Sequence, residues 1–332
     1  MRPILTALIA ALTATTAIAA DKNLIGTAGV ADLEERIAEL EATTARKGNR
    51  KVHLTVSGWV AEQVTWWNDG TESNFYVGGL GETLATHVKF TGEALINPDV
   101  SAGYVLHIEA NTEDSLQHNQ LSDDTETGIV VRQSFWFIRS KGLGKVSVGR
   151  QSSASDNAAM LVDGSGSMVP ANWVLFDNAG FFLRIGGTML PVTWGGELGY
   201  CTHTGAPTGA DCNGVPSDSV RYDSPVFGGF SVSAAWGEDD FWDAAVRYSG
   251  EFGGFKVAAT GAYSQNTEPR GFFMSDLDSS YWQVGAYVEH TATGIWVYGA
   301  YAKERNEYDL FFLPPGAYAA PDGRHWYVKA GL

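Results

Sequence analysis

The chain has 332 residues, of which 39 are glycine and 12% are aromatic. Asp and Glu number 38 against 22 Lys and Arg, so the formal net charge is -16 at pH 7. This balance argues against a nucleic-acid partner, because phosphate binding needs a basic surface. After residue 20 no apolar run approaches the roughly 18 residues of a membrane helix, so any membrane span has to be made of strands closed into a barrel.

Residues 1–20 are predicted to be a secretory signal peptide. Arg2 gives a positive start, residues 4–12 form a short apolar core, and Ala17-Ile18-Ala19 has the small-x-small pattern of a cleavage site. The alternative is a buried N-terminal helix. We expect a chain that is exported from the cytoplasm.

Residues 30–44 are predicted to form a short helix, within a coiled-coil segment and linker that cover residues 21–50. The apolar spacing alternates between three and four, which is typical of a coiled-coil seam. This seam spans only about two heptads and needs support from another oligomer contact. The alternative is an amphipathic helix that lies against the rest of the chain. The seam residues are Val30, Leu33, Ile37 and Leu40.

From residue 51 onward the apolar residues recur with a period of two, which indicates β-strands. The clearest strand covers residues 99–111, where Tyr104, Leu106 and Ile108 alternate with His107 and Glu109. The pattern predicts an all-β region with about 13–14 strands. The predicted strands are 51–66, 84–96, 99–111, 129–140, 144–150, 181–187, 192–200, 219–224, 229–236, 242–250, 254–264, 281–290, 294–304 and 325–332.

The links between these strands alternate between short and long. Short turn-like links lie at 97–99, 142–144, 225–229, 251–254 and 291–294. Most of the others are long, with Glu238-Asp239-Asp240 as a brief exception. One rim with tight turns and one with long loops is the pattern of an outer-membrane β-barrel. A soluble sandwich, whose polar faces meet bulk water, has no reason to sort its loops in this way.

The longest segment without alternation covers residues 151–180. A loop of this length inside a compact β protein is uncommon and is usually functional or disordered. Residues 160–162 (Met-Leu-Val) and 173–176 (Trp-Val-Leu-Phe) make it too apolar for a disordered segment. We expect it to fold back into the lumen of the barrel and to narrow it.

Cys201 and Cys212 flank a turn-rich stretch of ten residues. In an exported protein they meet an oxidising compartment, where a disulfide persists. Two cysteines at this spacing with a single histidine between them do not form a recognised zinc pattern. We expect Cys201 and Cys212 to form a structural disulfide.

Three motifs carry a family resemblance. They are Val-His-Leu-Thr-Val-Ser-Gly-Trp-Val at 52–60, Gly-Lys-Val-Ser-Val-Gly-Arg-Gln at 144–151 before the long segment, and Val-Arg-Tyr-Asp-Ser-Pro at 220–225 followed by Phe-Gly-Gly-Phe at 227–230. In this order they resemble the general porins of Gram-negative outer membranes, and most of all the alphaproteobacterial porins with a short N-terminal coiled coil.

The resemblance implies a homotrimer of 16-stranded transmembrane antiparallel β-barrels, each with a water-filled channel. It implies a periplasmic coiled coil, contact with outer-membrane lipid and lipopolysaccharide, and passive diffusion of small hydrophilic solutes and ions. Porin chains typically end on an aromatic residue, whereas this chain ends at Leu332 in a predicted strand. We therefore expect a porin β-barrel over residues 51–332 that is truncated at its C-terminus; the alternative is a complete 14-stranded barrel.

In this family, basic residues on the barrel wall face acidic residues of the third loop. Alternation places Lys89, Arg184 and Arg247 on inward faces, whereas Arg150 points inward only if Gly149 forms a bulge. The candidate pore-lining residues are Lys89, Arg132, Arg150, Arg184 and Arg247 on the wall and Asp156, Asp163 and Asp177 on the long segment.

Nothing in the sequence indicates catalysis. Gly164-Ser165-Gly166-Ser167 does not match the Gly-x-Ser-x-Gly elbow of hydrolases, and the histidines are scattered. We expect no enzyme activity, no metal site and no cofactor. The alternative functions are a channel selective for sugars or phosphate, a surface adhesin or structural barrel, and an outer-membrane hydrolase.

Overall fold

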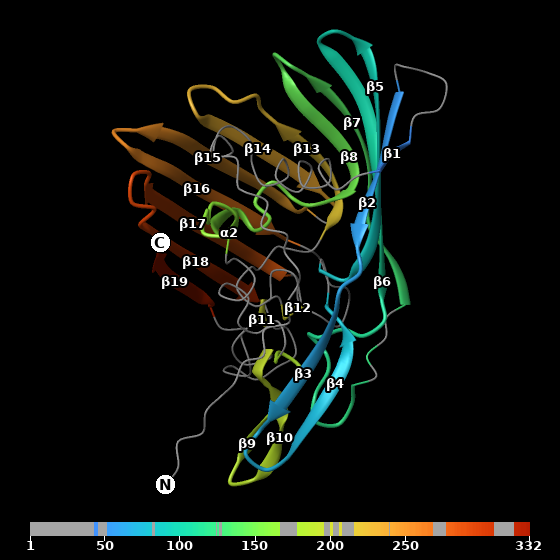
Figure 1. Ribbon diagram of the computed structural model, residues 1–332, viewed down its shortest axis with the longest axis vertical. Coiled ribbons are helices and arrows are strands. Elements are labelled where there is room, and N and C mark those ends of the chain that lie inside the picture. Colours follow the sequence, from blue (N-terminus) through green and yellow to red (C-terminus); the bar gives the residue numbers. More distant parts are fainter. Residues whose placement is uncertain are drawn as a thin grey trace.

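The computed structural model describes residues 43–45, 52–81, 84–123, 125, 128–166, 178–195, 200–201, 206–207, 216–238, 240–267, 277–308 and 322–332. A 13-stranded antiparallel sheet dominates it, and this sheet curves around the short helix α2 (Ala158–Leu161) (Figure 1). The strand order is β1 (Thr43–Ala45), β2 (Val52–Trp59), β5 (Thr86–Asn97), β6 (Val100–Asn111), β7 (Gly128–Ser140), β8 (Gly144–Gln151), β13 (Ser217–Asp223), β14 (Phe230–Gly237), β15 (Trp242–Phe252), β16 (Phe255–Asn266), β17 (Leu277–His290), β18 (Trp296–Tyr308) and β19 (Arg324–Gly331).

Three pairs of strands lie outside this sheet. They are β3 (Glu62–Asn68) with β4 (Ser73–Gly79), β9 (Phe182–Ile185) with β10 (Thr188–Thr193), and β11 (Tyr200–Cys201) with β12 (Ala206–Pro207). The hairpins β3–β4 and β9–β10 lie close together beyond one end of the sheet (Figure 1). None of the helices in the described residues is long and apolar enough to cross a membrane.

The convex face of the sheet is apolar and exposed. Val232 pairs with Val246, Trp236 pairs with Trp242, and all four side chains are exposed. Val284, Val297 and Val328 continue this exposed face toward the last strand. Apolar side chains at alternate positions of several neighbouring strands suit a hydrocarbon environment and not water.

The concave face of the same strands is polar and largely buried. Ser233, Asp243, Ser264, Gln283 and Glu304 are each at most 4% exposed. A soluble sandwich buries apolar side chains and exposes polar ones. Here that order is reversed, as in a transmembrane barrel with a polar interior.

The predicted strand at 51–66 proved to be two strands. The ladder between β2 and β5 ends at the pair Trp59 and His87. The amide of Ala61 then donates to the hydroxyl of Thr86 at 3.0 Å instead of to a backbone carbonyl. The chain leaves the sheet here, and in the described part of the chain β3 pairs with β4 alone.

The predicted wall strands at 181–187 and 192–200 were wrong. Strand β8 pairs directly with β13, so no strand from residues 181–200 lies between them. Gly186 and Gly187 have φ of 57° and 83°, which closes a two-residue turn between β9 and β10. The alternation that predicted wall strands belongs instead to a separate hairpin.

The strand predicted at 129–140 contains a bulge. The pairing of β6 with β7 passes from His107–Gln133 to Ile108–Val131, which leaves Arg132 as the extra residue. A bulge places two successive residues opposite one and interrupts the alternation. The period-two pattern of this strand is therefore broken at Arg132.

Strand β1 occupies Thr43–Ala45 and pairs with β2. The prediction that the helix extends to residue 44 was wrong, because Thr43 and Thr44 lie in this strand. The remainder of that helix, including the seam residues Val30, Leu33, Ile37 and Leu40, lies outside the described residues, as does the predicted signal peptide.

Candidate functional site

The first half of the long segment runs along the concave face of the sheet. The Arg221 guanidinium on β13 donates from Nη1 to the carbonyls of Ser152 and Ser153, at 3.1 and 3.0 Å. On β15, Nη2 of Arg247 donates to the carbonyl of Ala154 at 2.6 Å. Two arginines therefore bind three successive carbonyls where the segment leaves β8.

The next contacts come from strands further along the sheet. Asp243 on β15 accepts from both the amide and the hydroxyl of Ser155 through Oδ2, each at 2.6 Å. Gln283 on β17 and Tyr298 on β18 bind the backbone of Ala159. Ala158 packs against Ala245 and Ala262, which are small enough to let α2 lie close to the wall.

The segment reaches the last strand of the sheet at Asp163. Lys329 on β19 forms an ion pair with Asp163, and its Nζ also donates to Ser165 Oγ at 3.1 Å. Residues 152–165, which we call the inner segment, thus cross β13, β15, β17, β18 and β19 in order, with at least one side chain of each strand bound to them. The segment lies inside the curve of the sheet (Figure 1).

Four of the five predicted wall cations lie on strands of the main sheet, and three of them are Arg132, Arg150 and Arg247. Arg247 binds the segment as described above. Arg132, the bulge residue of β7, is buried and pairs with Glu109 through Nε and Oε2 at 2.8 Å. Arg150 keeps a regular register with both β7 and β13, so the bulge at Gly149 on which its inward direction depended is missing from these two ladders.

Lys89 lies in a cluster of basic and aromatic side chains on the opposite part of the sheet. It pairs in register with His107 on β6, and the rings of His107 and His87 have centroids 4.3 Å apart. The ring of Trp59 meets that of His87 edge-on at 4.1 Å. This cluster, made of Trp59, His87, Lys89 and His107, faces the same side of the sheet as Glu109.

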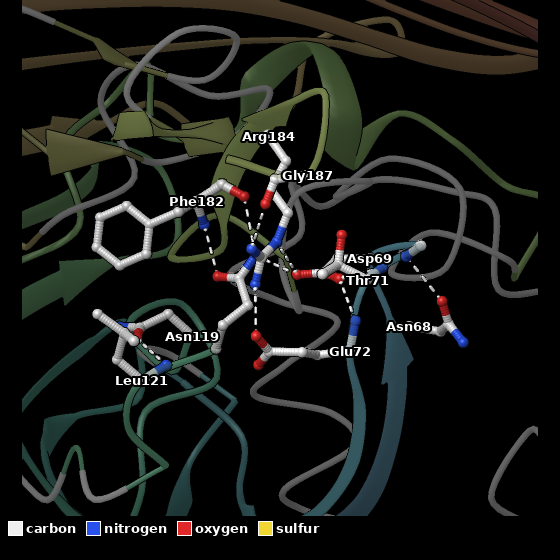
Figure 2. Close-up of polar contacts among 11 residues, drawn as sticks. Asn68, Asp69, Thr71, Glu72, Asn119, Leu121, Phe182, Arg184 and Gly187 are labelled. Atoms are coloured by element: carbon white, nitrogen blue, oxygen red, sulfur yellow. Dashed lines mark hydrogen bonds and ion pairs between the residues drawn. The ribbon is translucent and has the colours of Figure 1, made fainter. Parts of the chain in front are cut away.

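Arg184 does not lie on the sheet at all. It belongs to the hairpin β9–β10, and its Nε contacts Asp69 Oδ2 at 2.6 Å while its Nη2 contacts Glu72 Oε1 at 3.2 Å (Figure 2). Its Nη1 donates to the carbonyl of Gly187 at 3.0 Å. The prediction that Arg184 is a wall residue placed it on the wrong element, because among the described strands β9 pairs only with β10.

Gln120, in the loop between β6 and β7, connects that loop to the hairpins β3–β4 and β9–β10. It donates to Asp69 Oδ2 at 3.3 Å and to the carbonyl of Phe182 at 2.9 Å, and it accepts from the Phe182 amide at 2.8 Å. Beside it, Trp67 packs edge-on against Phe181 at 5.4 Å. We call Asp69, Glu72, Gln120 and Arg184 the rim cluster.

The rim cluster shifts the acid–base equilibrium of its charged groups. Burial acts to raise the pKa of Asp69, but hydrogen bonds from the amides of Glu72 and Thr71 and from Arg184 and Gln120 outweigh it. The pKa of Asp69 is therefore well below its ordinary value. The hydrogen bond to Asp69 correspondingly raises the pKa of Arg184.

Asp156 and Asp163 both lie on the inner segment, and Asp163 makes the ion pair with Lys329. Asp156 accepts from the side chain of Asn157 at 2.7 Å. Asp177 and Cys212 lie outside the described residues, and so does the predicted disulfide. Within the described residues, no group of three or more His, Cys, Asp or Glu side chains is arranged to hold a metal ion.

Several residues that bind the segment were not among the predicted pore-lining residues. Their inward position follows from the same alternation, but alternation alone does not tell which polar side chain meets the segment. The missed residues are Arg221, Asp243, Gln283, Tyr298 and Lys329.

Comparison with known proteins gives a family and a set of similar folds. A family model described as Gram-negative porin matches residues 5–331. No curated protein matches the chain by sequence. The anion-selective porin from Comamonas acidovorans is 17% identical with a TM-score of 0.52, over 78% of this chain and 70% of that chain. OmpF of Salmonella typhi is 13% identical with a TM-score of 0.43, over 87% of each chain. At 17% identity the first likeness shows a shared fold.

Proposed function

The chain belongs to the Gram-negative porin family and is an outer-membrane β-barrel channel, and from this premise we propose that small hydrophilic solutes and ions diffuse passively between residues 152–165 and the wall formed by β2 and β5–β7. Family membership also supports a channel rather than an enzyme. The observation that carries the proposal is the inner segment, which is bound to the polar concave face of a sheet whose convex face is apolar.

The charges of the inner wall support a division of roles. Arg221, Arg247 and Lys329 are occupied by the segment through hydrogen bonds or an ion pair. Lys89, on the other part of the wall, has no hydrogen bond or ion pair to another described residue. We infer that Lys89 faces the solute path, with Arg132 held back by Glu109.

Asp156 is the remaining acidic candidate on the inner segment. Its side chain is half-buried, whereas the side chain of Asp163 is fully buried in its contact with Lys329. Asp156 lies within electrostatic reach of Arg247. We infer that Asp156 lines the solute path and that Asp163 serves to fix the segment. Arg150 lies on the wall, and its regular register gives it no inward direction, so we do not place it on the solute path.

The test is electrical. The purified protein should form water-filled channels in a planar lipid bilayer, and deletion of residues 155–166 should raise the conductance per channel and admit larger sugars in liposome swelling. The sheet should persist, because its ladders do not include this segment. A wild-type protein that forms no channels would refute the proposed function.

The position of the segment needs its own test. Leu161 is only partly buried, whereas Ala159 is 4% exposed. A Leu161→Cys variant modified with a bulky charged thiol reagent should show reduced current. The unsubstituted chain, with its own Cys201 and Cys212, is labelled in parallel as the control. Unchanged current after verified labelling would place the segment away from the solute path.

The inward aromatic rings beside the inner segment do not favour a sugar channel. Sugar channels need aromatic rings that are open to the lumen, but the inward rings of Tyr287 and Tyr298 are at most 1% exposed. Gly164 of the inner segment lies over Tyr287, since a Cβ at this glycine would meet the ring at 2.8 Å. These aromatic rings are used to pack the segment.

We also propose a homotrimer in contact with outer-membrane lipid and lipopolysaccharide. The support is the family resemblance and the predicted coiled coil of residues 21–50. The exposed convex face, with Val232, Trp236 and Val246, supports contact with lipid. Chemical cross-linking in detergent, followed by mass measurement of the products, tests the trimer.

A further inference from the structure

Helix α2 is too short to be stable by its own hydrogen bonds. It has 4 residues, and Asn157 at its N-terminus has φ 51° and makes no side-chain cap hydrogen bond. Helices much shorter than about 12 residues are unstable in isolation, because nucleation fixes several residues for one hydrogen bond. Its conformation must therefore be supported from outside the segment.

Gln283 of β17 supplies part of this support. Its Oε1 accepts from the amide of Ala159 at 2.8 Å, and its Nε2 donates to the carbonyl of Ser155 at 2.8 Å. In a regular helix an amide bonds to the carbonyl four positions earlier. Ala159 is the second residue of α2, so its amide has no such partner within the helix, and the Gln283 amide, which is only 2% exposed, supplies one.

Tyr298 of β18 binds the other side of the same residue. Its hydroxyl donates to the carbonyl of Ala159 at 2.7 Å, and its side chain is fully buried. Both backbone groups of Ala159 are thus bound by side chains of the barrel wall. A buried backbone group without a partner is costly, so these two contacts define where Ala159 is stable.

Gly285 sets how closely Ala159 approaches the wall. A Cβ at Gly285 would lie 2.4 Å from the carbonyl oxygen of Ala159, whose position the hydrogen bond to Tyr298 fixes. Real Cβ atoms do not approach so closely, so an alanine here would have to displace the segment. The wall lies on one side of the segment, so displacement moves it toward the lumen.

We propose that Gln283, Gly285 and Tyr298 form a seat that positions the backbone of Ala159 and thereby sets the width of the channel. This inference rests on the proposed function, since it assigns the distance between the inner segment and the wall to named wall residues. They are positioning residues, and they act on the solute path only through the segment.

The decisive comparison uses two glycines on neighbouring strands. Gly261 of β16 is in register with Val284, next to Gly285, and a Cβ there would meet its nearest atom at 3.8 Å. Gly285→Ala should lower the single-channel conductance in a planar bilayer and the size limit for sugars in liposome swelling. Gly261→Ala should leave both at the wild-type values. Unchanged or increased conductance in Gly285→Ala would overturn the proposal.

A second pair of variants keeps the proposal testable if Gly285→Ala does not fold. Gln283→Met removes both hydrogen bonds at similar length, and Gln283→Glu keeps an acceptor for the Ala159 amide. Gln265→Met is the control, because Gln265 on β16 binds Asp278 and not the segment. Gln283→Met should give noisy currents with several conductance levels. Gln283→Glu should give less noise than Gln283→Met, and Gln265→Met should give the steady currents of the wild type. Steady wild-type currents in Gln283→Met would overturn the seat.

These outcomes are distinct from failure of the proposed function. A wild-type protein without channel activity refutes the function itself. A conducting wild type whose Gly285→Ala variant behaves like Gly261→Ala refutes only the seat. The heat-induced unfolding of each variant in detergent shows whether the sheet itself has changed.

Discussion

Lys329 of the last strand and Asp163 of the inner segment form an ion pair although they are 166 positions apart in the sequence. The side chain of Asp163 is fully buried and that of Lys329 is 11% exposed. The Lys329 ammonium also lies 5.5 Å from the ring centre of Tyr298. This contact closes the series of wall side chains that bind residues 152–165.

Loss of this ion pair should destabilise the protein. Lys329→Met leaves the Asp163 carboxylate buried without its partner, and breaking a buried pair from one side costs about 3 kcal/mol. Unfolding by urea or heat in detergent measures this cost. Lys256→Met is the control, because the pair of Lys256 with Glu289 is more exposed, at 13% and 18%. An equal loss of unfolding free energy in both variants would show that the burial of Asp163 adds nothing to the cost of breaking its ion pair.

The rim cluster should loosen at low pH. Because the pKa of Asp69 is lowered in the folded protein, its carboxylate contributes stability above its ordinary pKa of 3.8, and this stability is lost as the pH falls below that value. Hydrogen exchange of β3–β4 and β9–β10, followed by mass spectrometry, should speed up below about pH 4 relative to the main sheet.

Asp69→Asn should remove most of this pH dependence, since it removes the titrating group. Asp99→Asn is the control, because Asp99 is an exposed carboxylate at the β5–β6 turn with a long contact to Lys141 of 3.8 Å. Identical pH profiles in the wild type and Asp69→Asn would contradict the assignment of the transition to Asp69.

The channel mouths should favour cations. The chain carries 38 acidic and 22 basic residues, with acidic clusters at 123–126 and 238–240. Negative potential at a mouth concentrates cations, and salt screens it over about 10 Å at 0.1 M and 3 Å at 1 M. Reversal potentials across a KCl gradient should show cation preference that decreases as salt rises. Glu238→Gln with Asp239→Asn and Asp240→Asn should weaken it. Anion preference in dilute KCl would contradict this prediction.

Lys89 should act against this preference. Lys89→Gln removes a positive charge from the inner wall and should increase the preference for cations in the same measurement. Lys141→Gln is the matched control, since its side chain is 74% exposed at a turn. If both variants shift the reversal potential equally, Lys89 does not face the solute path.

The predicted coiled coil should stabilise the trimer. Leu33→Asp with Leu40→Asp places two charges in the seam and should lower the temperature at which the trimer dissociates in detergent, with conductance per channel unchanged. Glu35→Ala with Glu39→Ala changes two positions that face away from the seam and serves as the control. Equal dissociation temperatures for the wild type and the Leu variant would make the helix a passive spacer.

Much of the sheet could be predicted from the sequence, because alternation is a local property. Each strand carries its own inward and outward positions, and Val232, Trp236 and Val246 show the outward set in the sequence itself. The inward direction of Arg247 followed from the same rule. The rule did not distinguish a wall strand from a separate hairpin, so Arg184 was placed on the wrong element.

The sequence by itself determined the all-β architecture, the apolar outside and polar inside of the sheet, and the break in alternation at residues 151–180. Only the tertiary structure decided which polar residues bind the segment. Gln283 and Ala159 are 124 positions apart, and Lys329 and Asp163 are 166 apart. Such pairs form where the curved sheet and the crossing segment bring distant strands together, and the side-chain period of a single strand carries no information about that crossing.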